Sequence, residues 1–275
     1  MIRARQISFS YPTLELFHSL DLHIRGGEIF SILGPNGSGK STLLRILRGV
    51  LRPTAGTVLL EGKTLSSWSR RKIARHIAVV SQSEEVHFPY PVADAVAMGR
   101  FPHHGLWREN QANWRKEVAE ALEWAGITHL ARRSVTRLSA GERQKVIIAR
   151  ALAQRTPILF LDEPAAHLDV FQQVELARLL CRLRNEQGKT VVHVSHDINL
   201  SAAISDRILL LAPAGELLHQ GEPAVVLTER NLFETFGLEM KISRQPDGRT
   251  PRIDIPLTRP RDDLKTAGAP VEDAG

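Results

Sequence analysis

"EIFSILGPNGSGKST", residues 28–42, is the stretch that decides the fold. Its first half is a nearly continuous apolar run, which is typical of a strand buried on both faces of a sheet. The residues that follow it begin a helical pattern of apolar positions. Between the two, Gly34 and Gly39 bracket four residues ahead of Lys40 and Ser41, matching the pattern G-x-x-x-x-G-K-[ST]. A strand, a glycine-rich loop and a helix in this order predict an α/β domain with a phosphate-binding loop.

The chemistry of this loop predicts a nucleoside triphosphate site with Mg²⁺. Glycines let the backbone curl, so that successive N–H groups converge on phosphate oxygens. Lys40 supplies a point charge to the β and γ phosphates, and the hydroxyl of Ser41 is placed to ligate Mg²⁺. The predicted nucleotide contacts of the loop are Gly34, Pro35, Asn36, Gly37, Ser38, Gly39, Lys40, Ser41 and Thr42.

Further apolar runs predict that the loop belongs to a parallel sheet. "PILFLDEP" occupies residues 157–164 and "TVVHVSHD" occupies residues 190–197. Helical patterns separate the runs, notably over residues 41–49, 141–154 and 170–187. Strands that alternate with helices indicate a parallel sheet flanked by helices. The predicted fold class is therefore a P-loop NTPase core of α/β type.

Two other segments depart from this pattern. Leu20, Leu22 and Ile24 alternate with polar residues, which predicts a half-buried antiparallel strand and hence an N-terminal antiparallel β subdomain. Residues 83–137 are helix-rich and contain tryptophan, and "VAEALEWAG" is their clearest helical stretch. We therefore expect a helical insertion subdomain there.

The predicted domain covers residues 1–243, and residues 244–275 form a C-terminal extension. This extension is rich in proline, aspartate and glycine, and we expect it to be partly disordered.

The composition argues against a disulfide-rich or membrane-spanning protein but does not identify the function. The chain of 275 residues has a formal net charge of +6, which suits nucleic acid, anionic lipid or nucleotide equally. One cysteine, Cys181, excludes a disulfide framework and fits a reducing compartment. No apolar run approaches the length of a membrane span, and the N-terminus lacks the apolar region of a signal peptide. We expect a chain that does not cross a bilayer by itself.

Two neighbouring carboxylates follow the strand predicted at 157–164. Ligands of open α/β sheets bind at the carboxyl ends of the strands, where Asp162 and Glu163 stand. Adjacent side chains on a strand point to opposite faces, so the two carboxylates need not share one task. We assign Asp162 to the Mg²⁺ shell. Glu163 is the predicted general base for a water in line with the γ phosphate.

"LSAGERQKVIIARAL", residues 138–152, predicts a second site for an anion. Ser139 followed three residues later by Glu142 forms a capping box, which explains how a helix starts there. Gly141 leaves the first N–H groups of that helix uncovered, and such groups attract anions. Because the chain already holds one phosphate loop, the second site is expected to serve another molecule.

This stretch resembles the signature motif of ABC-type ATPases, and the resemblance covers residues 2–243. In that family two subunits stack head to tail, and the signature of one closes on the γ phosphate of the ATP bound by the other. The resemblance implies that Ser139 and Gly141 contact ATP held by a second copy of the chain. Ala140 departs from the family, which has glycine at this position.

The resemblance assigns four more positions. Tyr11 corresponds to an aromatic residue under adenine, and Gln82 corresponds to the Q-loop glutamine, a Mg²⁺ ligand that senses the γ phosphate. Asp169 in "AAHLD" corresponds to the D-loop, although His167 stands where the family commonly has a small residue. His196 corresponds to the switch histidine that contacts the γ phosphate. His193, inside the strand, is expected to be a structural histidine.

The resemblance also favours a transport function. The insertion of roughly fifty residues lacks the sustained heptads of repair ATPases, and the chain has one ATPase domain where ribosome-acting members usually have two. "AMGRFPHHG", "HDINLSAAISDRILLL", "GEPAVVLTERNLFETFG" and "PDGRTPRIDIP" resemble the ATPases of bacterial uptake systems for iron–siderophores, haem and vitamin B12, the siderophore branch most closely. Cargo identity rests on this resemblance alone, because the ATPase does not touch the cargo.

This family membership implies a set of partners and a location. The expected partners are ATP, a second copy of the chain, transmembrane permease subunits and, indirectly, a periplasmic or surface substrate-binding protein, with no nucleic acid. The segment of residues 90–105, which includes Asp94, lies where the family meets the short cytoplasmic helices of its permeases. The implied location is the cytoplasmic face of the inner membrane. The alternatives are another cargo, such as haem or vitamin B12, or a soluble ABC ATPase that acts on cytoplasmic complexes.

Overall fold

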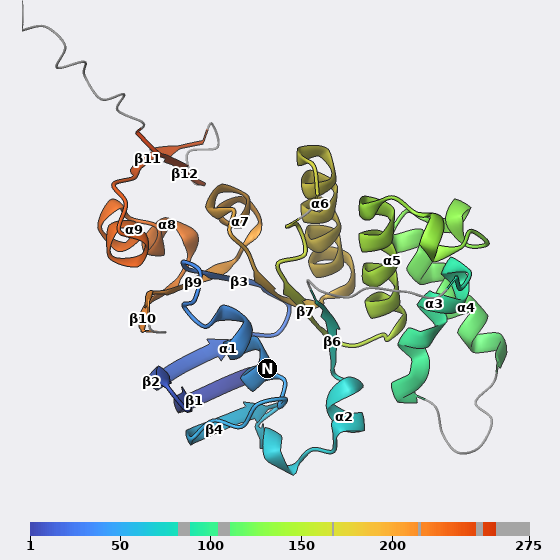
Figure 1. Cartoon of the computed structure of the whole chain (residues 1–275), viewed down its shortest axis with the longest axis horizontal. Coiled ribbons are helices and arrows are strands. Elements are labelled where there is room, and N and C mark those ends of the chain that lie inside the picture. The colour runs from blue at the N-terminus through green and yellow to red at the C-terminus, as the bar shows by residue number, and fades with distance from the viewer. Residues whose placement is uncertain (82–88, 104–110, 167, 214–215, 246–249, 257–275) are drawn as a thin grey trace, which may run out of the picture.

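The computed structural model describes residues 1–81, 89–103, 111–166, 168–213, 216–245 and 250–256. At its centre is a six-stranded sheet in the order β10-β9-β3-β8-β7-β6. The neighbours from β9 to β6 pair in parallel, and β10 pairs antiparallel with β9 (Figure 1). The strands span Ile29–Leu33 (β3), Ile77–Val80 (β6), Ile158–Asp162 (β7), Thr190–Val194 (β8), Arg207–Leu211 (β9) and Leu217–Gly221 (β10). The parallel sheet expected from the apolar runs is confirmed.

Both faces of this sheet are buried, because alternate residues of one strand belong to different hydrophobic clusters. Leu159 and Leu161 of β7 pack with helices α5 (Ala140–Ala153) and α6 (Val170–Gln187). Phe160 of the same strand packs on the other side with α1 (Lys40–Leu47). A strand that packs on both faces requires an apolar run with no polar alternation, which is what the sequence has there.

A four-stranded antiparallel sheet covers the α1 side of the core, in the order β2-β1-β4-β5. Its strands span Ile2–Tyr11 (β1), Leu14–Ile24 (β2), Ala55–Leu60 (β4) and Lys63–Thr64 (β5). Leu20, Leu22 and Ile24 are buried in the same cluster as α1, while Asp21 is exposed. The antiparallel β subdomain predicted from their alternation is confirmed.

The helical subdomain lies at the opposite side of the molecule in Figure 1 from the C-terminal elements. Its α-helices are α3 (Val92–Ala97), α4 (Gln111–Trp124) and α5, which pack together in the cluster that also contains α6. Short 3₁₀ helices at Met98–His103, Thr128–Leu130 and Val135–Arg137 connect them, while another at Leu65–Ser67 and α2 (Arg70–Ala74) precede β6. Residues 83–88 and 104–110 of the predicted insertion lie outside the described residues.

The C-terminal elements pack against the core as far as residue 256. They are α7 (Ile198–Ile204), α8 (Pro223–Val226), α9 (Glu229–Phe236) and the hairpin of β11 (Lys241–Arg244) and β12 (Pro251–Asp254). The side chain of Asn199 in α7 bonds twice to the backbone of Ile253, accepting from its N–H at 2.8 Å and donating to its carbonyl at 3.0 Å. The domain boundary expected between residues 243 and 244 thus falls inside β11.

Residues 257–275 of the extension lie outside the described residues. Within the part of the chain that the structure describes, every helix is too short or too polar to span a membrane.

A polar cluster joins β3 and β8 to the end of α7. His193 in β8 is buried, and its Nδ1 lies 2.8 Å from the Ser31 hydroxyl, which in turn lies 2.5 Å from the hydroxyl of Ser205. Burial lowers the pKa of His193 from its ordinary 6.5 to about 4, because the charged imidazolium would lose its hydration. His193 is therefore a neutral structural histidine, as the sequence predicted.

This cluster predicts a pH-dependent stability. Between pH 6.5 and 4 the unfolded chain binds a proton at His193 that the folded chain does not, so the free energy of unfolding falls by about 3 kcal/mol as the pH drops through that window. Urea unfolding at pH 7 and at pH 4.5 should show a smaller loss in His193→Asn than in the unaltered protein. Equal losses in the two proteins would contradict a neutral, buried histidine.

Candidate functional site

Tight packing explains two glycines of the phosphate loop, Gly34 and Gly39. The loop leaves β3 after Leu33 and enters α1 at Lys40. A Cβ atom on Gly34 would overlap the carbonyl oxygen of Leu211 in β9, which is backbone and cannot swing aside. A Cβ atom on Gly39 would lie 2.8 Å from the Phe17 ring. Gly39 also has a φ of 91°, which residues other than glycine rarely adopt. The predicted order of strand, loop and helix is confirmed.

Lys40 is fixed at the centre of this loop. Its side chain is buried, and Nζ donates to the carbonyls of Gly34 at 2.9 Å and Pro35 at 2.8 Å. Burial lowers the pKa of Lys40, while the negative charges of Glu163 and Asp162 oppose that shift. An ammonium group has three N–H donors, so one donor is left over for a phosphate oxygen.

Ser41 and Asp162, the residues predicted to hold Mg²⁺, are brought together. The Ser41 hydroxyl donates to Oδ1 of Asp162 at 2.9 Å, although the two residues are 121 positions apart. Mg²⁺ is usually held by one or two carboxylates and by phosphates of the substrate, not by a cage of protein ligands. The described residues contain no group of three or more His, Cys, Asp or Glu side chains suited to a metal. A hydroxyl and a carboxylate beside a phosphate loop fit this mode of binding.

Glu163 and His196 also meet at this edge of the sheet. Each follows the carboxyl end of its strand, and β7 and β8 are parallel neighbours. Oε1 of Glu163 lies 2.6 Å from Nε2 of His196. Glu163 has a φ of 50°, a left-handed conformation that few residues other than glycine adopt, and its N–H donates to the Val194 carbonyl. The backbone therefore holds this carboxylate at a sharp bend, in contact with a histidine that can orient it.

Of the two residues Tyr11 and Gln82, which were assigned by resemblance, the structure describes only Tyr11. The Tyr11 hydroxyl lies 3.2 Å from the hydroxyl of Thr42 in α1, and its ring packs edge-on against Phe9. Tyr11 is thus beside the phosphate loop, with 38% of its surface exposed. Its stacking on adenine stays a prediction. Gln82, two residues after β6, lies outside the described residues, as does His167.

The signature segment starts helix α5 as predicted, with its capping box intact. The Ser139 hydroxyl accepts from the N–H of Glu142 at 3.2 Å, and the Glu142 carboxylate accepts from the N–H of Ser139 at 2.8 Å. Among the described residues, the N–H groups of Ala140 and Gly141 have no recorded acceptor, and no hydrogen bond or ion pair joins this segment to the phosphate loop. The phosphate loop and the start of α5, the two predicted anion-binding features, thus share no such contact among the described residues.

Asp169, the predicted D-loop residue, is the N-cap of α6, where its Oδ1 accepts from the N–H of Gln172 at 2.8 Å. Gln172 was missed by the sequence analysis. Its carboxamide lies against Gly141, which belongs to the preceding helix, α5. The only sequence signal for Gln172 was its place in the helix predicted over residues 170–187.

Comparison with known proteins places this geometry among nucleotide-binding subunits of transporters. A family model described as "ABC transporter" matches residues 17–166. The ferric enterobactin transport ATP-binding protein FepC of Escherichia coli K12 is 36% identical over 262 residues, covering 94% of both chains. The hemin import ATP-binding protein HmuV of Escherichia coli O157:H7 is 39% identical over 259 residues, covering 92% of this chain and 98% of HmuV.

The fold is also similar to a solved transporter. A putative metal-chelate type ABC transporter, solved in an inward-facing conformation, has a chain with a TM-score of 0.79 and 32% identity. The match covers 92% of the present chain and 96% of that chain. The likeness thus extends well beyond the residues 17–166 of the family model, to most of both chains.

Proposed function

The chain belongs to the ABC transporter family and is an ABC-type ATPase, and from this premise we propose that two copies bind ATP head to tail to power uptake of an iron chelate into a bacterium. The observation that carries the proposal is the separation of the two anion-binding features. The phosphate loop has its own lysine, hydroxyl and carboxylates, while the start of α5 offers N–H groups that, among the described residues, share no hydrogen bond with that loop. In a two-fold dimer, the phosphate loop of each subunit faces the start of α5 of the other subunit.

The phosphate loop binds and orients the substrate. Lys40 and the loop N–H groups hold the β and γ phosphates, and Tyr11 stacks on the adenine, by analogy with bases on aromatic side chains. Ser41, Asp162 and Gln82 would hold Mg²⁺, which supplies charge compensation for the phosphates when it is bound. The binding of Mg²⁺ by these three residues is part of the proposal.

Glu163 is the proposed general base. It removes a proton from a water that attacks the γ phosphorus, while the bond from that phosphorus to the bridging oxygen breaks and ADP leaves. His196, 2.6 Å from the carboxylate, orients Glu163 and contacts the γ phosphate. Because Glu163 is held by its backbone as well, the carboxylate needs little reorganisation before the reaction.

The second subunit completes the site. Ser139 and the N–H of Gly141 from the partner close on the γ phosphate, and Asp169 shapes the contact between the two copies. Such N–H groups at a helix start favour a negatively charged ligand. Hydrolysis removes the shared γ phosphate, and the dimer then loosens.

An iron–siderophore is the proposed cargo, on the resemblance of the four segments from residue 97 to residue 256 to the siderophore branch. The two similar proteins of E. coli differ in cargo, since one is named for ferric enterobactin and the other for hemin. Hemin is the second candidate, because HmuV is 39% identical to this chain.

The proposed place of work is the cytoplasmic face of the inner membrane, beneath a pair of permease subunits. The contact to them is assigned to the segment after residue 89, where Asp94 is exposed in the first turn of α3. A periplasmic or surface binding protein delivers the cargo to the permease and does not contact this chain. Movement of the helical subdomains with the ATP-bound dimer would reorient the membrane helices.

We expect Glu163→Gln to bind ATP as the unaltered protein does and to hydrolyse it about 10²- to 10⁴-fold more slowly, because the amide cannot accept the proton. Equilibrium nucleotide binding and phosphate release measure the two effects. Glu175→Gln, a change on exposed α6 surface, is the control and should leave both unchanged. Hydrolysis at the normal rate in Glu163→Gln would overturn the assignment of the base.

Mixing two inactive variants tests closure in trans. Lys40→Ala and Ser139→Ala subunits can form mixed dimers in which one composite site is intact, so the mixture should recover up to about a quarter of the normal rate. A mixture of Lys40→Ala with Glu163→Gln is the control. Lys40 and Glu163 act on the same ATP from one subunit, so that mixture contains no intact site and should stay inactive. No recovery in the first mixture would count against the head-to-tail dimer.

Co-purification separates the transporter from a soluble ATPase acting on cytoplasmic complexes. Co-expressed with permease subunits of a bacterial iron-chelate importer, the chain should be retained on membranes, and Asp94→Lys should reduce that retention by reversing an exposed charge at the proposed contact. Glu239→Lys, an equally exposed carboxylate after α9, is the matched control. A chain found only in the soluble fraction, with permease present, would favour the alternative.

A further inference from the structure

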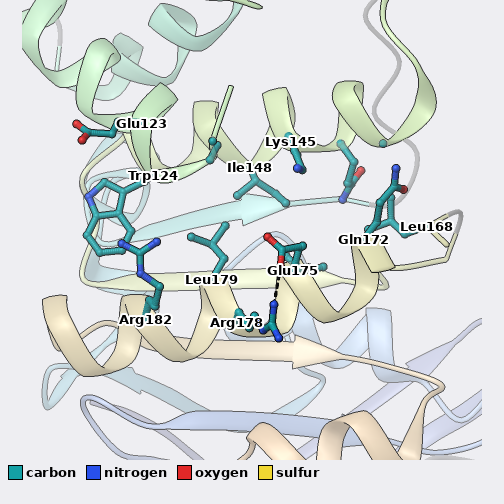
Figure 2. A pocket seen from close by; sticks show the side chains of 15 residues that line it. Glu123, Trp124, Lys145, Ile148, Leu168, Gln172, Glu175, Arg178, Leu179 and Arg182 are labelled. Atoms are coloured by element: carbon teal, nitrogen blue, oxygen red, sulfur yellow. Dashed lines mark hydrogen bonds and ion pairs between the residues drawn. The ribbon is translucent and has the colours of Figure 1, made fainter. Parts of the chain in front are cut away.

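A groove of about 370 Å³ separates the signature helix α5 from α6 (Figure 2). Its walls include the apolar side chains of Ile148 and Leu179. At one end, the guanidinium of Arg182 lies over the Trp124 ring at 4.7 Å. At the other end, Figure 2 shows Gln172 beside Leu168, where α6 begins. The contacts at the two ends of the groove therefore help to set the position of α5 relative to α6.

The backbone of Gln172 is tied to the D-loop. Gln172 is the third residue of α6, and its N–H donates to Asp169 at 2.8 Å. Its neighbour Gln173 donates through Nε2 to the carbonyl of Leu168 at 3.0 Å. The first turn of α6 and the residues Leu168 and Asp169 therefore move together.

The side chain of Gln172 is in contact with Gly141. A Cβ atom built on Gly141 would lie 2.5 Å from Cδ of Gln172, with both carboxamide heteroatoms also too close. Gly141 is buried in α5 and does not have a left-handed backbone, so its conformation does not require glycine. A side chain at Gly141 would have to displace the Gln172 carboxamide, which is the far end of a flexible side chain.

The surroundings suit a contact that transmits movement. In the described part of the chain, the Gln172 carboxamide makes no hydrogen bond. It lies against Gly141, whose N–H group and that of Ala140 are open at the start of α5. Gln172 thus holds its partner by shape rather than by a fixed hydrogen bond. Because the carboxamide fills the space beside Gly141, a movement of α6 toward α5 is passed on through this contact.

We propose that Gln172 is a positioning residue that keeps the signature glycine, Gly141, in register with the D-loop residue Asp169, so that the two segments of one subunit approach the partner's ATP as one unit. The inference rests on the proposed function, because it assumes that both segments act in trans. It assigns Gln172 no direct contact with ATP.

The test measures ATP-driven dimerisation in the hydrolysis-deficient Glu163→Gln background, and steady-state hydrolysis in the unaltered background, with the full chain and its permease. Gln172→Ala should weaken the dimer and lower kcat about tenfold while KM for ATP stays within about twofold, because ATP is held by Lys40 and Ser41 of the other subunit's intact loop. Gln172→Met, which preserves length and bulk, should restore most of both.

Two further variants sharpen the result. Gln172→Glu has the same shape but places a negative charge beside the site of the γ phosphate, so it should weaken the dimer more than Gln172→Ala does, and added salt should reduce the difference. Glu175→Gln, one turn further along α6 in the same groove, is the matched control and should behave as the parent does. The melting temperature without nucleotide should be nearly unchanged in all four proteins.

Each outcome decides the matter. The inference is wrong if Gln172→Ala and Gln172→Glu leave both measurements unchanged, namely dimerisation in the Glu163→Gln background and ATP hydrolysis in the unaltered background. It is also wrong if Gln172→Ala lowers the melting temperature and ATP binding together with kcat, since that pattern marks a structural role. If the Glu163→Gln parent itself stays monomeric with Mg-ATP and permease, the head-to-tail dimer is wrong, and the inference falls with it.

Discussion

The parallel alignment of β3, β8 and β7 is the constraint on which the rest of the molecule depends. Parallel pairing puts the carboxyl ends of the three strands at one edge of the sheet, and each strand carries its polar residues just past that end. Lys40 and Ser41 follow β3, Asp162 ends β7 and Glu163 follows it, and His196 follows β8. No long-range adjustment is needed to assemble the site, because forming the sheet already assembles it.

The sheet can hold this alignment because both of its faces are covered. The antiparallel sheet and α1 lie on one face, and α5 and α6 lie on the other. The polar side chains of Ser31, His193 and Ser205 lie within this apolar core and are paired with one another. A neutral histidine there adds a directional link between β3 and β8 at the strands that carry the phosphate loop and the switch histidine.

The second anion-binding feature belongs to a different part of the fold. The start of α5 is attached to the helical subdomain, and a groove lies between it and α6. The catalytic groups, by contrast, are fixed to the sheet. In the proposed dimer, this division places the groups that bind ATP on the sheet and the surface that closes on them beside the groove. The Gln172–Gly141 contact joins the two parts at the D-loop, where they would meet the second subunit.

Local patterns in the sequence determined the elements and the chemical groups, and tertiary structure decided which groups touch. The buried runs, the alternation of Leu20, Leu22 and Ile24, the capping box at Ser139 and the helix over residues 170–187 are all properties of neighbouring residues, so the sequence alone was sufficient for them. The hydrogen bond from Ser41 to Asp162, the pairing of Glu163 with His196 and the packing of Gln172 on Gly141 join residues about 30 to 120 positions apart. Such contacts depend on strand order and on the packing of helices across the sheet, and a periodic pattern along one segment carries no information about either.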